Sequence, residues 1–281
     1  MASGRIQRLT LLNQDFSAHR HWSERLENTP SNIEVLDDGV LVDAGGSLLH
    51  LDPEGIPGKA FHTFLDIFDL VTAPGEQIWI NPDLTPIPSE RALLLRLNRL
   101  GQRTGKAGRR SQDDKWKGLL DRVFLAAGPG RIAAVHAIMP QLRIFDSSTG
   151  RELARTRIDH PSFAFMAQAY DWPYYDRSKR SLRAPRYTAG AAALDDRLYV
   201  LLHLPDPEII EFSWEGEELR RWRLRDLGFQ AFDYGGFDVR RSEGKLKWVT
   251  SVVHRYQEDG RRHYQPRVLE VSFRASEAGE P

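Results

Sequence analysis

One pattern of short strands and tight turns recurs along this chain, and a repeat of that size limits the possible folds more than any other feature. The clearest copy covers residues 131–157, and a second covers residues 197–224. Each copy has an apolar run, a break at proline, a second apolar run, a glycine-containing turn and an arginine-rich run. Alternation with period two between turn residues is typical of half-buried antiparallel strands. We therefore expect a chain built from repeated β-meanders.

Three further copies can be aligned with these two, one at residues 245–273 and weaker ones beginning at Gly39 and Glu76. The five copies share an anchor pair at Leu51-Asp52, Leu97-Asn98, Phe145-Asp146, Phe212-Ser213 and Val271-Ser272. A glycine follows the anchor closely in the first four copies, at Gly55, Gly101, Gly150 and Gly216. The spacing of the anchors fits a four-stranded unit with loop insertions in the later copies.

An apolar or small-residue stretch precedes each copy, at residues 33–36, 64–71, 123–127, 189–194 and 232–239. Small side chains allow such strands to converge on a common axis as the innermost strands of several sheets. Radial repetition of four-stranded sheets also protects the sheet edges. The sequence therefore predicts an all-β fold, a β-propeller of four-stranded antiparallel blades with five readable repeats and either five or six blades.

We expect residues 1–281 to form a single propeller domain, because no linker-like stretch divides the chain. The last copy lacks a fourth strand, so residues 1–13 are predicted to supply it and close the ring. Residues 101–122 are predicted to be a basic loop between blades, with a helical turn near 112–120. Residues 160–187 are predicted to be an insertion between blades, and residues 274–281 a disordered tail.

Composition excludes several classes of function. The chain has 39 basic and 39 acidic residues and a formal net charge of zero, which argues against a nucleic-acid partner or acidic lipid. No apolar run is long enough for a membrane span. The absence of cysteine excludes disulfides and thiolate metal sites. Localisation stays open: extracytoplasmic (periplasmic or secreted) if an export signal has been trimmed, otherwise cytoplasmic.

Three histidines mark the end of the second strand in the last three copies, and polar residues stand near that position in the first two. These residues are His136, His203, His254, Asp43 and Asn81. These residues predict a polar ring around one mouth of the central channel of the propeller, and this ring is expected to bind a ligand. Neutral imidazoles facing a common axis can also hold a divalent metal, so the three histidines are candidate metal ligands in a protein otherwise expected to need no cofactor. The alternative is structural, with each ring buried and bonded to the backbone.

The 160–187 insertion mixes aromatic and arginine residues, including Trp172, Tyr174 and Tyr175. Such mixtures are common where a protein binds a protein partner or a small-molecule or carbohydrate ligand. The alternative is a loop that folds onto its own blade. Carboxylates near the inner strands, Asp66, Asp69, Asp233 and Asp238, are expected to be satisfied by turns or nearby arginines.

The recurring units "RIAAVH…LRIFDSSTGREL" and "RLYVLLH…IIEFSWEGEEL" resemble bacterial six-bladed propellers of the NHL/TolB-like kind, especially uncharacterised six-bladed propeller proteins that are often secreted or lipid-anchored. This resemblance covers most of residues 31–273 and implies a propeller with a ligand or partner surface on its loop face. Some relatives in the wider superfamily are lyases or lactonases with metal in the channel. The leading hypothesis is a non-enzymatic binding or scaffold propeller. The alternative is a metal-dependent lyase or hydrolase with a histidine-lined site at the channel mouth.

Overall fold

The computed structural model describes residues 9–12, 18–22, 30–44, 47–54, 56–62, 66–83, 91–111, 120–160, 187–202, 207–223, 231–242, 244–258 and 261–273. Every regular element in these residues is a β-strand. Accordingly, this part of the chain holds no helix of the length and apolarity that a membrane span requires. The predicted all-β class is confirmed. The predicted tail at residues 274–281 lies outside the described part.

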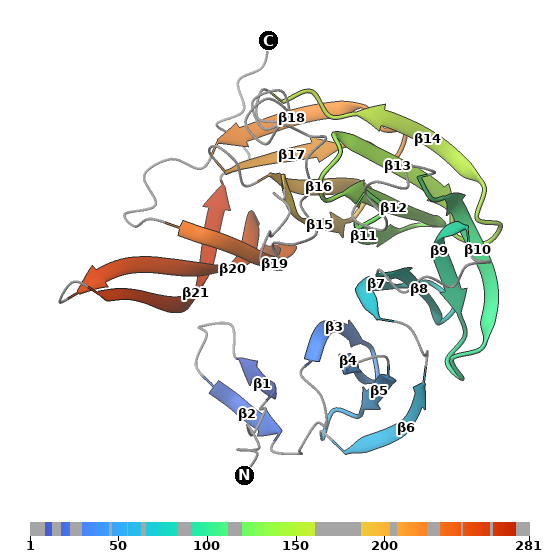
Figure 1. The fold of residues 1–281 in the computed structure, drawn as a ribbon, viewed down its shortest axis with the longest axis horizontal. Helices are drawn as coiled ribbons and strands as arrows, with labels where there is room; N and C mark the ends of the chain where they lie inside the picture. The colour runs from blue at the N-terminus through green and yellow to red at the C-terminus, as the bar shows by residue number, and fades with distance from the viewer. Residues whose placement is uncertain are drawn as a thin grey trace, which may run out of the picture.

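Five antiparallel sheets stand around a common axis as the blades of a β-propeller (Figure 1). The first blade contains β3 (Pro30–Leu36), β4 (Gly39–Ala44), β5 (Ser47–Leu51) and β6 (Pro57–His62). The second contains β7 (Ile67–Ala73), β8 (Gln77–Pro82), β9 (Ala92–Leu97) and β10 (Arg103–Arg109). The third contains β11 (Val123–Gly128), β12 (Arg131–His136), β13 (Gln141–Asp146) and β14 (Glu152–Arg157). The fourth contains β15 (Thr188–Leu194), β16 (Arg197–Leu202), β17 (Glu208–Phe212) and β18 (Glu218–Arg223). The fifth contains three strands, β19 (Ala231–Ser242), β20 (Lys245–Glu258) and β21 (Arg261–Phe273).

The described residues form five blades, so the six-bladed form implied by the resemblance is not confirmed. Two more strands, β1 (Leu9–Leu12) and β2 (Ala18–Trp22), form a two-stranded sheet of their own. Strand β1 thus pairs with β2 and not with β21, which differs from the predicted closing of the last blade by residues 1–13. Residues 1–8 and 13 lie outside the described part. Local pairing is favoured here because β2 follows β1 after only a few residues.

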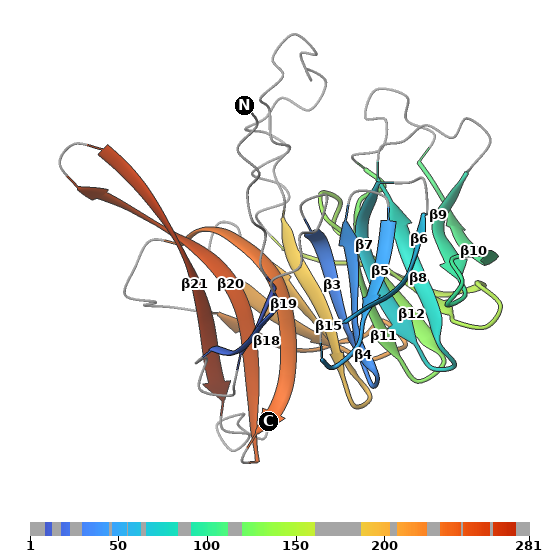
Figure 2. The same ribbon diagram turned by 90° about the horizontal axis from the view of Figure 1, so that it is seen from below.

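The innermost strands contact each other in chain order, from β3 through β7, β11 and β15 to β19. Strands β19 and β3 are not in comparable contact. Figure 1 shows β1 and β2 in the sector between the fifth and first blades, and Figure 2 shows them in front of β19 and β20. Neighbouring blades are thus in contact at four interfaces, which we call seams. Among the described strands, the fifth sector of the ring holds the β1–β2 sheet alone.

The basic segment at residues 101–122 differs from its prediction. Residues Arg103–Arg109 form β10, the outer strand of the second blade, rather than a loop. An outermost strand packs against the sheet on one side only, so it needs no regular alternation, and exposed basic residues protect its edge. Residues 112–119, where a helical turn was predicted, lie outside the described part.

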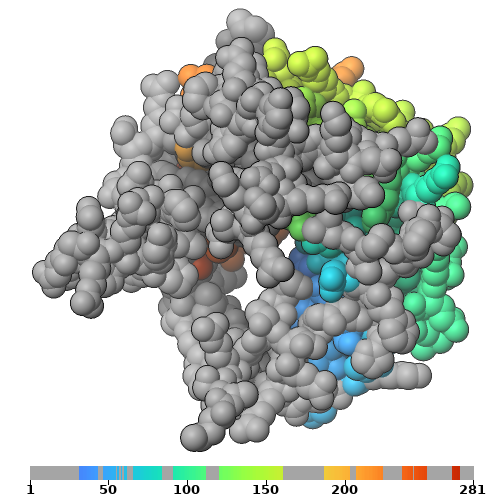
Figure 3. Space-filling view, viewed as in Figure 1, coloured from blue at the N-terminus to red at the C-terminus, as the bar shows by residue number. Residues whose placement is uncertain are grey.

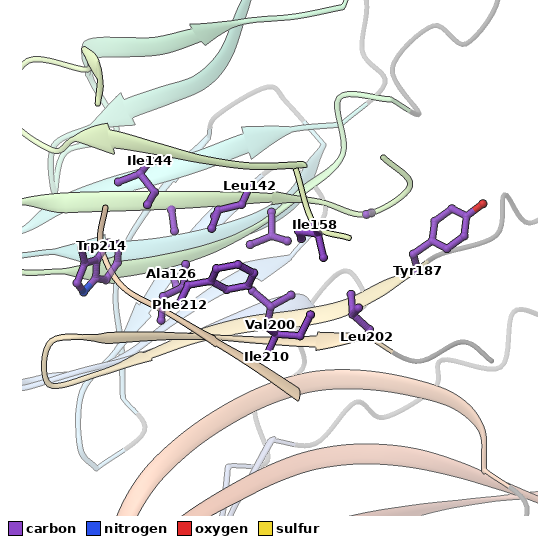
Figure 4. Close-up of a cluster of buried hydrophobic side chains, with 14 of the residues drawn as sticks. Ala126, Leu142, Ile144, Ile158, Tyr187, Val200, Leu202, Ile210, Phe212 and Trp214 are labelled. Atoms are coloured by element: carbon purple, nitrogen blue, oxygen red, sulfur yellow. The ribbon is translucent and has the colours of Figure 1, made fainter. Parts of the chain in front are cut away.

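One apolar cluster fills each of the four seams between consecutive blades. The largest joins the third and fourth blades, where Leu142 and Ile144 of β13 meet Val200 of β16 and Phe212 of β17 (Figure 4). The equivalent clusters lie between blades one and two, two and three, and four and five. Burial of apolar area between sheets is the main driving force for this stacking.

The repeated turn glycines contribute to the same seams. Gly101, Gly150 and Gly216 all have positive φ, at 73°, 74° and 89°. A Cβ atom on Gly150 would lie 2.2 Å from the carbonyl oxygen of Lys106 in the preceding blade. Added Cβ atoms on Gly101 and Gly216 would likewise meet the preceding blade, at Phe61 and Thr156. The glycine repeat therefore lets each turn approach the outer strand of the blade before it.

Candidate functional site

Three of the five predicted ring positions have described side chains, and all three are buried at the same end of the blades. Asp43, Asn81 and His136 lie near the ends of β4, β8 and β12. Asp43 pairs with Asn32 and Asn81 pairs with Asp69, which makes these two positions equivalent. His136 pairs with the first residue of its inner strand, as Pro82 does in the second blade, so His136 stands one residue further along.

Asn81 joins the second and third blades. Its side chain is fully buried, and Nδ2 donates to the carbonyl oxygens of Leu93 and Asp121, each at 3.0 Å. Its Oδ1 accepts from the N–H of Val123 at 3.1 Å. An amide can donate and accept at once, so one side chain satisfies backbone groups of two blades. Its role in this structure is to hold the seam.

Asp43 takes part in a similar link between the first and second blades. Its Oδ2 accepts from Nδ2 of Asn32 at 3.2 Å, and the same Nδ2 donates to the carbonyl oxygen of Ile67 at 3.1 Å. Ile67 begins β7, as Val123 begins β11. Polar side chains at this end of the blades therefore bind the start of the next inner strand.

The two ring nitrogens of His136 differ in their hydrogen bonding. Its Nδ1 lies 2.8 Å from the carbonyl oxygen of Leu120, so Nδ1 carries the proton and donates. Nε2 then presents a buried lone pair with no hydrogen-bond partner among the described residues. Burial lowers the pKa of this imidazole to about 4, and the ring is neutral at physiological pH.

This buried imidazole predicts a pH-dependent stability. Because the folded pKa is below the ordinary value of 6.5, the unfolded chain binds the proton more tightly, and stability falls as pH drops from 6.5 toward 4. His136→Asn keeps a donor toward Leu120 but does not titrate. Over this window we expect the wild type to lose more free energy of unfolding than the variant, by at most about 3 kcal/mol. Denaturant unfolding across the pH range measures this difference, and parallel curves down to pH 4 would contradict it.

Of the three candidate histidines, His136 alone has a described side chain. His203 lies outside the described residues. His254 lies inside β20, opposite Ala231 and Gln265, and not at a strand end, because the β20–β21 hairpin continues to Glu258. Within the described ranges no group of three metal-ligating side chains is present. Metal binding by these histidines stays a prediction.

The aromatic insertion is described only at its two ends. Trp172, Tyr174 and Tyr175 lie outside the described residues, so their role stays a prediction. At one end, Nε2 of His160 lies 3.0 Å from Oε2 of Glu208, and both side chains are buried. At the other end, Tyr187 is buried in the cluster between the third and fourth blades. The insertion is therefore anchored at both ends in that seam.

A different set of groups gathers on the innermost strands. Glu34 of β3, Asp69 of β7 and Asp238 of β19 all have pKa values raised above the ordinary value of a carboxyl group. Burial among protein atoms is the first cause of all three shifts, and it raises the pKa of Asp69 to about 7. The charge of Asp238 also raises the pKa of Glu34, and the charge of Glu34 raises that of Asp69. We call these three residues the acidic opening.

Two carboxylates of the acidic opening are held by groups of the next blade. Oε1 of Glu34 accepts from the N–H and Oγ1 of Thr72 in β7, at 3.0 and 2.9 Å. Oδ2 of Asp69 accepts from the N–H of Leu125 in β11 at 2.7 Å. Asp238 accepts from the N–H of Val239 beside it, at 2.8 Å. In the part of the chain that the structure describes, none of the three carboxylates forms an ion pair.

Figure 3 shows a gap near the middle of the molecule, bordered in part by blue atoms of the first blades. Groups with strongly perturbed pKa values cluster at functional sites, so these three carboxylates are candidates for a binding site. Sequence reasoning named Asp69 and Asp238 but expected turns or nearby arginines to satisfy them, and it missed Glu34. The available signal was an acidic residue inside the otherwise apolar stretch Ile33 to Leu36.

No protein-family model and no curated protein matches the chain. Among solved structures, a protein of unknown function from Bacteroides caccae is similar over 88% of this chain and 80% of its own, with 11% identity and a TM-score of 0.56. A putative exported protein from Bacteroides fragilis is similar over 88% and 74%, with 8% identity and a TM-score of 0.54. At these identities the similarity concerns the fold alone.

Proposed function

We propose that the protein is a non-enzymatic binding propeller that recognises a cationic ligand at the acidic opening. The observation that supports this is the set of three carboxylates on the inner strands of three blades, which have raised pKa values and no ion pair among the described residues. Bringing a cation to this opening would relieve the repulsion between them. A propeller is a suitable scaffold, because its inner strands place groups from separate blades around one axis.

The acidic opening lies on the innermost strands, whereas the sequence predicted a binding site in the polar ring at the ends of the second strands. The expected ligand-binding ring used Asp43, Asn81 and His136, which bind other groups of the protein in the structure. Glu34 and Asp238 retain contact with solvent. The acidic opening is therefore the better candidate for an external ligand.

Spermine, a linear polyamine, is a suitable probe for isothermal titration calorimetry. We expect binding to strengthen as pH rises through about 7, because Asp69 then becomes ionised. Glu34→Gln retains an oxygen for Thr72 and removes the charge. We expect this variant to bind spermine about tenfold more weakly, the effect of losing one charged hydrogen-bond partner.

Glu217→Gln is the matched control, because Glu217 is exposed between β17 and β18 of the fourth blade. We expect it to bind spermine as the wild type does. Equal affinities for wild type, Glu34→Gln and Glu217→Gln would overturn the proposal, and so would affinity that does not change with pH.

A further inference from the structure

The outer halves of the second and third blades are strongly basic. The outer half of a blade comprises its last two strands and the turn between them. Residues 92–109 and 141–157, which form these halves, hold nine basic and two acidic residues. The outer half of the first blade, residues 47–62, has one basic and two acidic residues, and that of the fourth blade, residues 208–223, has three basic and five acidic residues. We call residues 92–109 and 141–157 the basic rim.

Contacts across the seam join the two parts of the basic rim into one surface. Nη1 of Arg143 in β13 donates to the carbonyl oxygen of Arg109 in β10 at 3.2 Å. The turn at Gly150 lies against the backbone of Lys106 in β10. Figure 1 shows β10 and β14 along the outside of the ring, and Figure 3 shows green and yellow-green atoms of these blades at the surface there. The positive charges of the two blades therefore act together.

Part of this charge is compensated within the blades. Glu152 pairs with Arg143 and with Arg155, each at 2.6 Å. Arg99 pairs with acidic residues of the first and second blades. Four more basic residues of the rim are exposed and form no ion pair in the part of the chain that the structure describes: Lys106, Arg109, Arg151 and Arg157. These four charges are available to an anionic partner.

Strand β14 offers a free edge beside these charges. It is the last strand of its sheet, and among the described strands it pairs with β13 alone, so its outer edge has backbone groups available to another strand. Leu153, Arg155 and Arg157 are exposed, and they alternate with Ala154 and Thr156, which lie toward the fourth blade. An added strand would therefore meet arginines on one face, and Ala154 and the fourth blade on the other.

We propose that the edge of β14 binds an extended segment of a partner protein in which acidic residues alternate with apolar ones. Backbone pairing with the edge provides affinity, and the alternate side chains provide specificity. Opposite charges on neighbouring strands stabilise pairing, whereas like charges oppose it. The basic rim therefore repels the equally basic edge of a second copy and accepts an acidic strand.

The free edge favours a protein segment over other polyanions. A nucleic acid would be attracted by the same charges, but it has no backbone that pairs with a β-strand. The inference is also independent of the proposed function, because the basic rim lies on the outer strands and attracts anions, whereas the acidic opening lies on the innermost strands and attracts cations.

The test uses a fluorescent peptide of alternating valine and glutamate, with fluorescence anisotropy at low ionic strength as the readout. We expect the double variant Arg109→Gln/Arg157→Gln to bind this peptide about tenfold more weakly than the wild type, because two attracting charges are lost. A peptide of alternating valine and glutamine has the same pattern without the charge, and we expect it to bind weakly.

Arg220→Gln is the matched control. Arg220 is likewise exposed on an outer strand and forms no ion pair with a described residue, but it lies in the fourth blade, where acidic residues are in excess. We expect this variant to bind the acidic peptide as the wild type does.

Hydrogen exchange provides the second readout. Bound peptide should protect backbone amides of β14 from exchange, whereas binding at another surface would not. Thermal unfolding checks that the double variant remains folded, which is expected because both replaced side chains are exposed and unpaired among the described residues.

Three outcomes would overturn the inference. Equal affinity of the double variant and the wild type for the acidic peptide would exclude the basic rim. Absence of protection in β14 would exclude strand addition. A single-stranded thymidine oligonucleotide that competes with the peptide and binds as tightly would show that the rim is a general site for polyanions and not for a protein strand.

Discussion

Replacing Asn81 with alanine should lower the free energy of unfolding by about 3–5 kcal/mol, because a buried side chain that links two blades loses three hydrogen bonds at once. The N–H of Val123 then loses its acceptor, and the carbonyl oxygens of Leu93 and Asp121 lose their donor. None of these groups can be reached easily by water, since Asn81 is fully buried. Denaturant unfolding followed by tryptophan fluorescence measures the loss.

Asn98 offers a matched control with the same residue type and a similar number of bonds. Its Oδ1 accepts from the N–H groups of Leu100 and Gln102, and its Nδ2 donates to Gln102, all at the surface. Water can replace these partners, so Asn98→Ala should cost about 1 kcal/mol or less. Equal losses for the two variants would mean that Asn81 does not hold the seam.

Replacing Gly150 with alanine should be the second most damaging change. Alanine there meets both an unfavourable positive φ and the carbonyl oxygen of Lys106, which belongs to the backbone of the second blade. The expected loss is about 2–5 kcal/mol, of which about 1–2 comes from φ and about 1–3 from displaced packing. Denaturant unfolding measures it in the same way.

Gly130→Ala separates these two causes. Gly130 has a φ of 68°, but a Cβ atom there would have no neighbour within 4 Å. We expect it to cost about 1–2 kcal/mol, the backbone contribution alone. A loss at Gly150 no larger than at Gly130 would contradict the role of the repeated glycines in joining blades.

The fold could be predicted because each repeat shows short apolar strands between turn residues, a pattern that depends only on residues close together in the chain. Strands such as β12 and β16 are bounded by turn residues, and their buried residues are apolar in most positions. Strand β10 was missed because Arg103–Arg109 lies at the outside of its blade, where burial imposes no pattern. The pairing of β1 with β2 was missed because a short strand can pair with either of two edges, and the apolar pattern does not choose between them.

The candidate site was harder to predict than the fold. His136 and Asn81 were recognised as related polar positions, but the sequence does not tell a ligand-binding side chain from one that binds backbone across a seam. His254 was placed at a strand end because the polar residues that follow it were taken for a loop, although Asp259-Gly260 is a typical hairpin turn pair. Glu34 was missed because its surroundings come from Thr72 and Asp238, which are distant in the chain.

A carbon-13 NMR titration of the carboxyl groups of Glu34, Asp69 and Asp238, with and without saturating spermine, tests the central claim most directly. We expect all three to titrate above their ordinary values in the free protein, and Asp69 near 7. With spermine bound, all three pKa values should fall, because a nearby cation favours the charged form. Ordinary pKa values in the free protein, or values that saturating spermine leaves unchanged, would contradict the claim that the acidic opening is a binding site for cations.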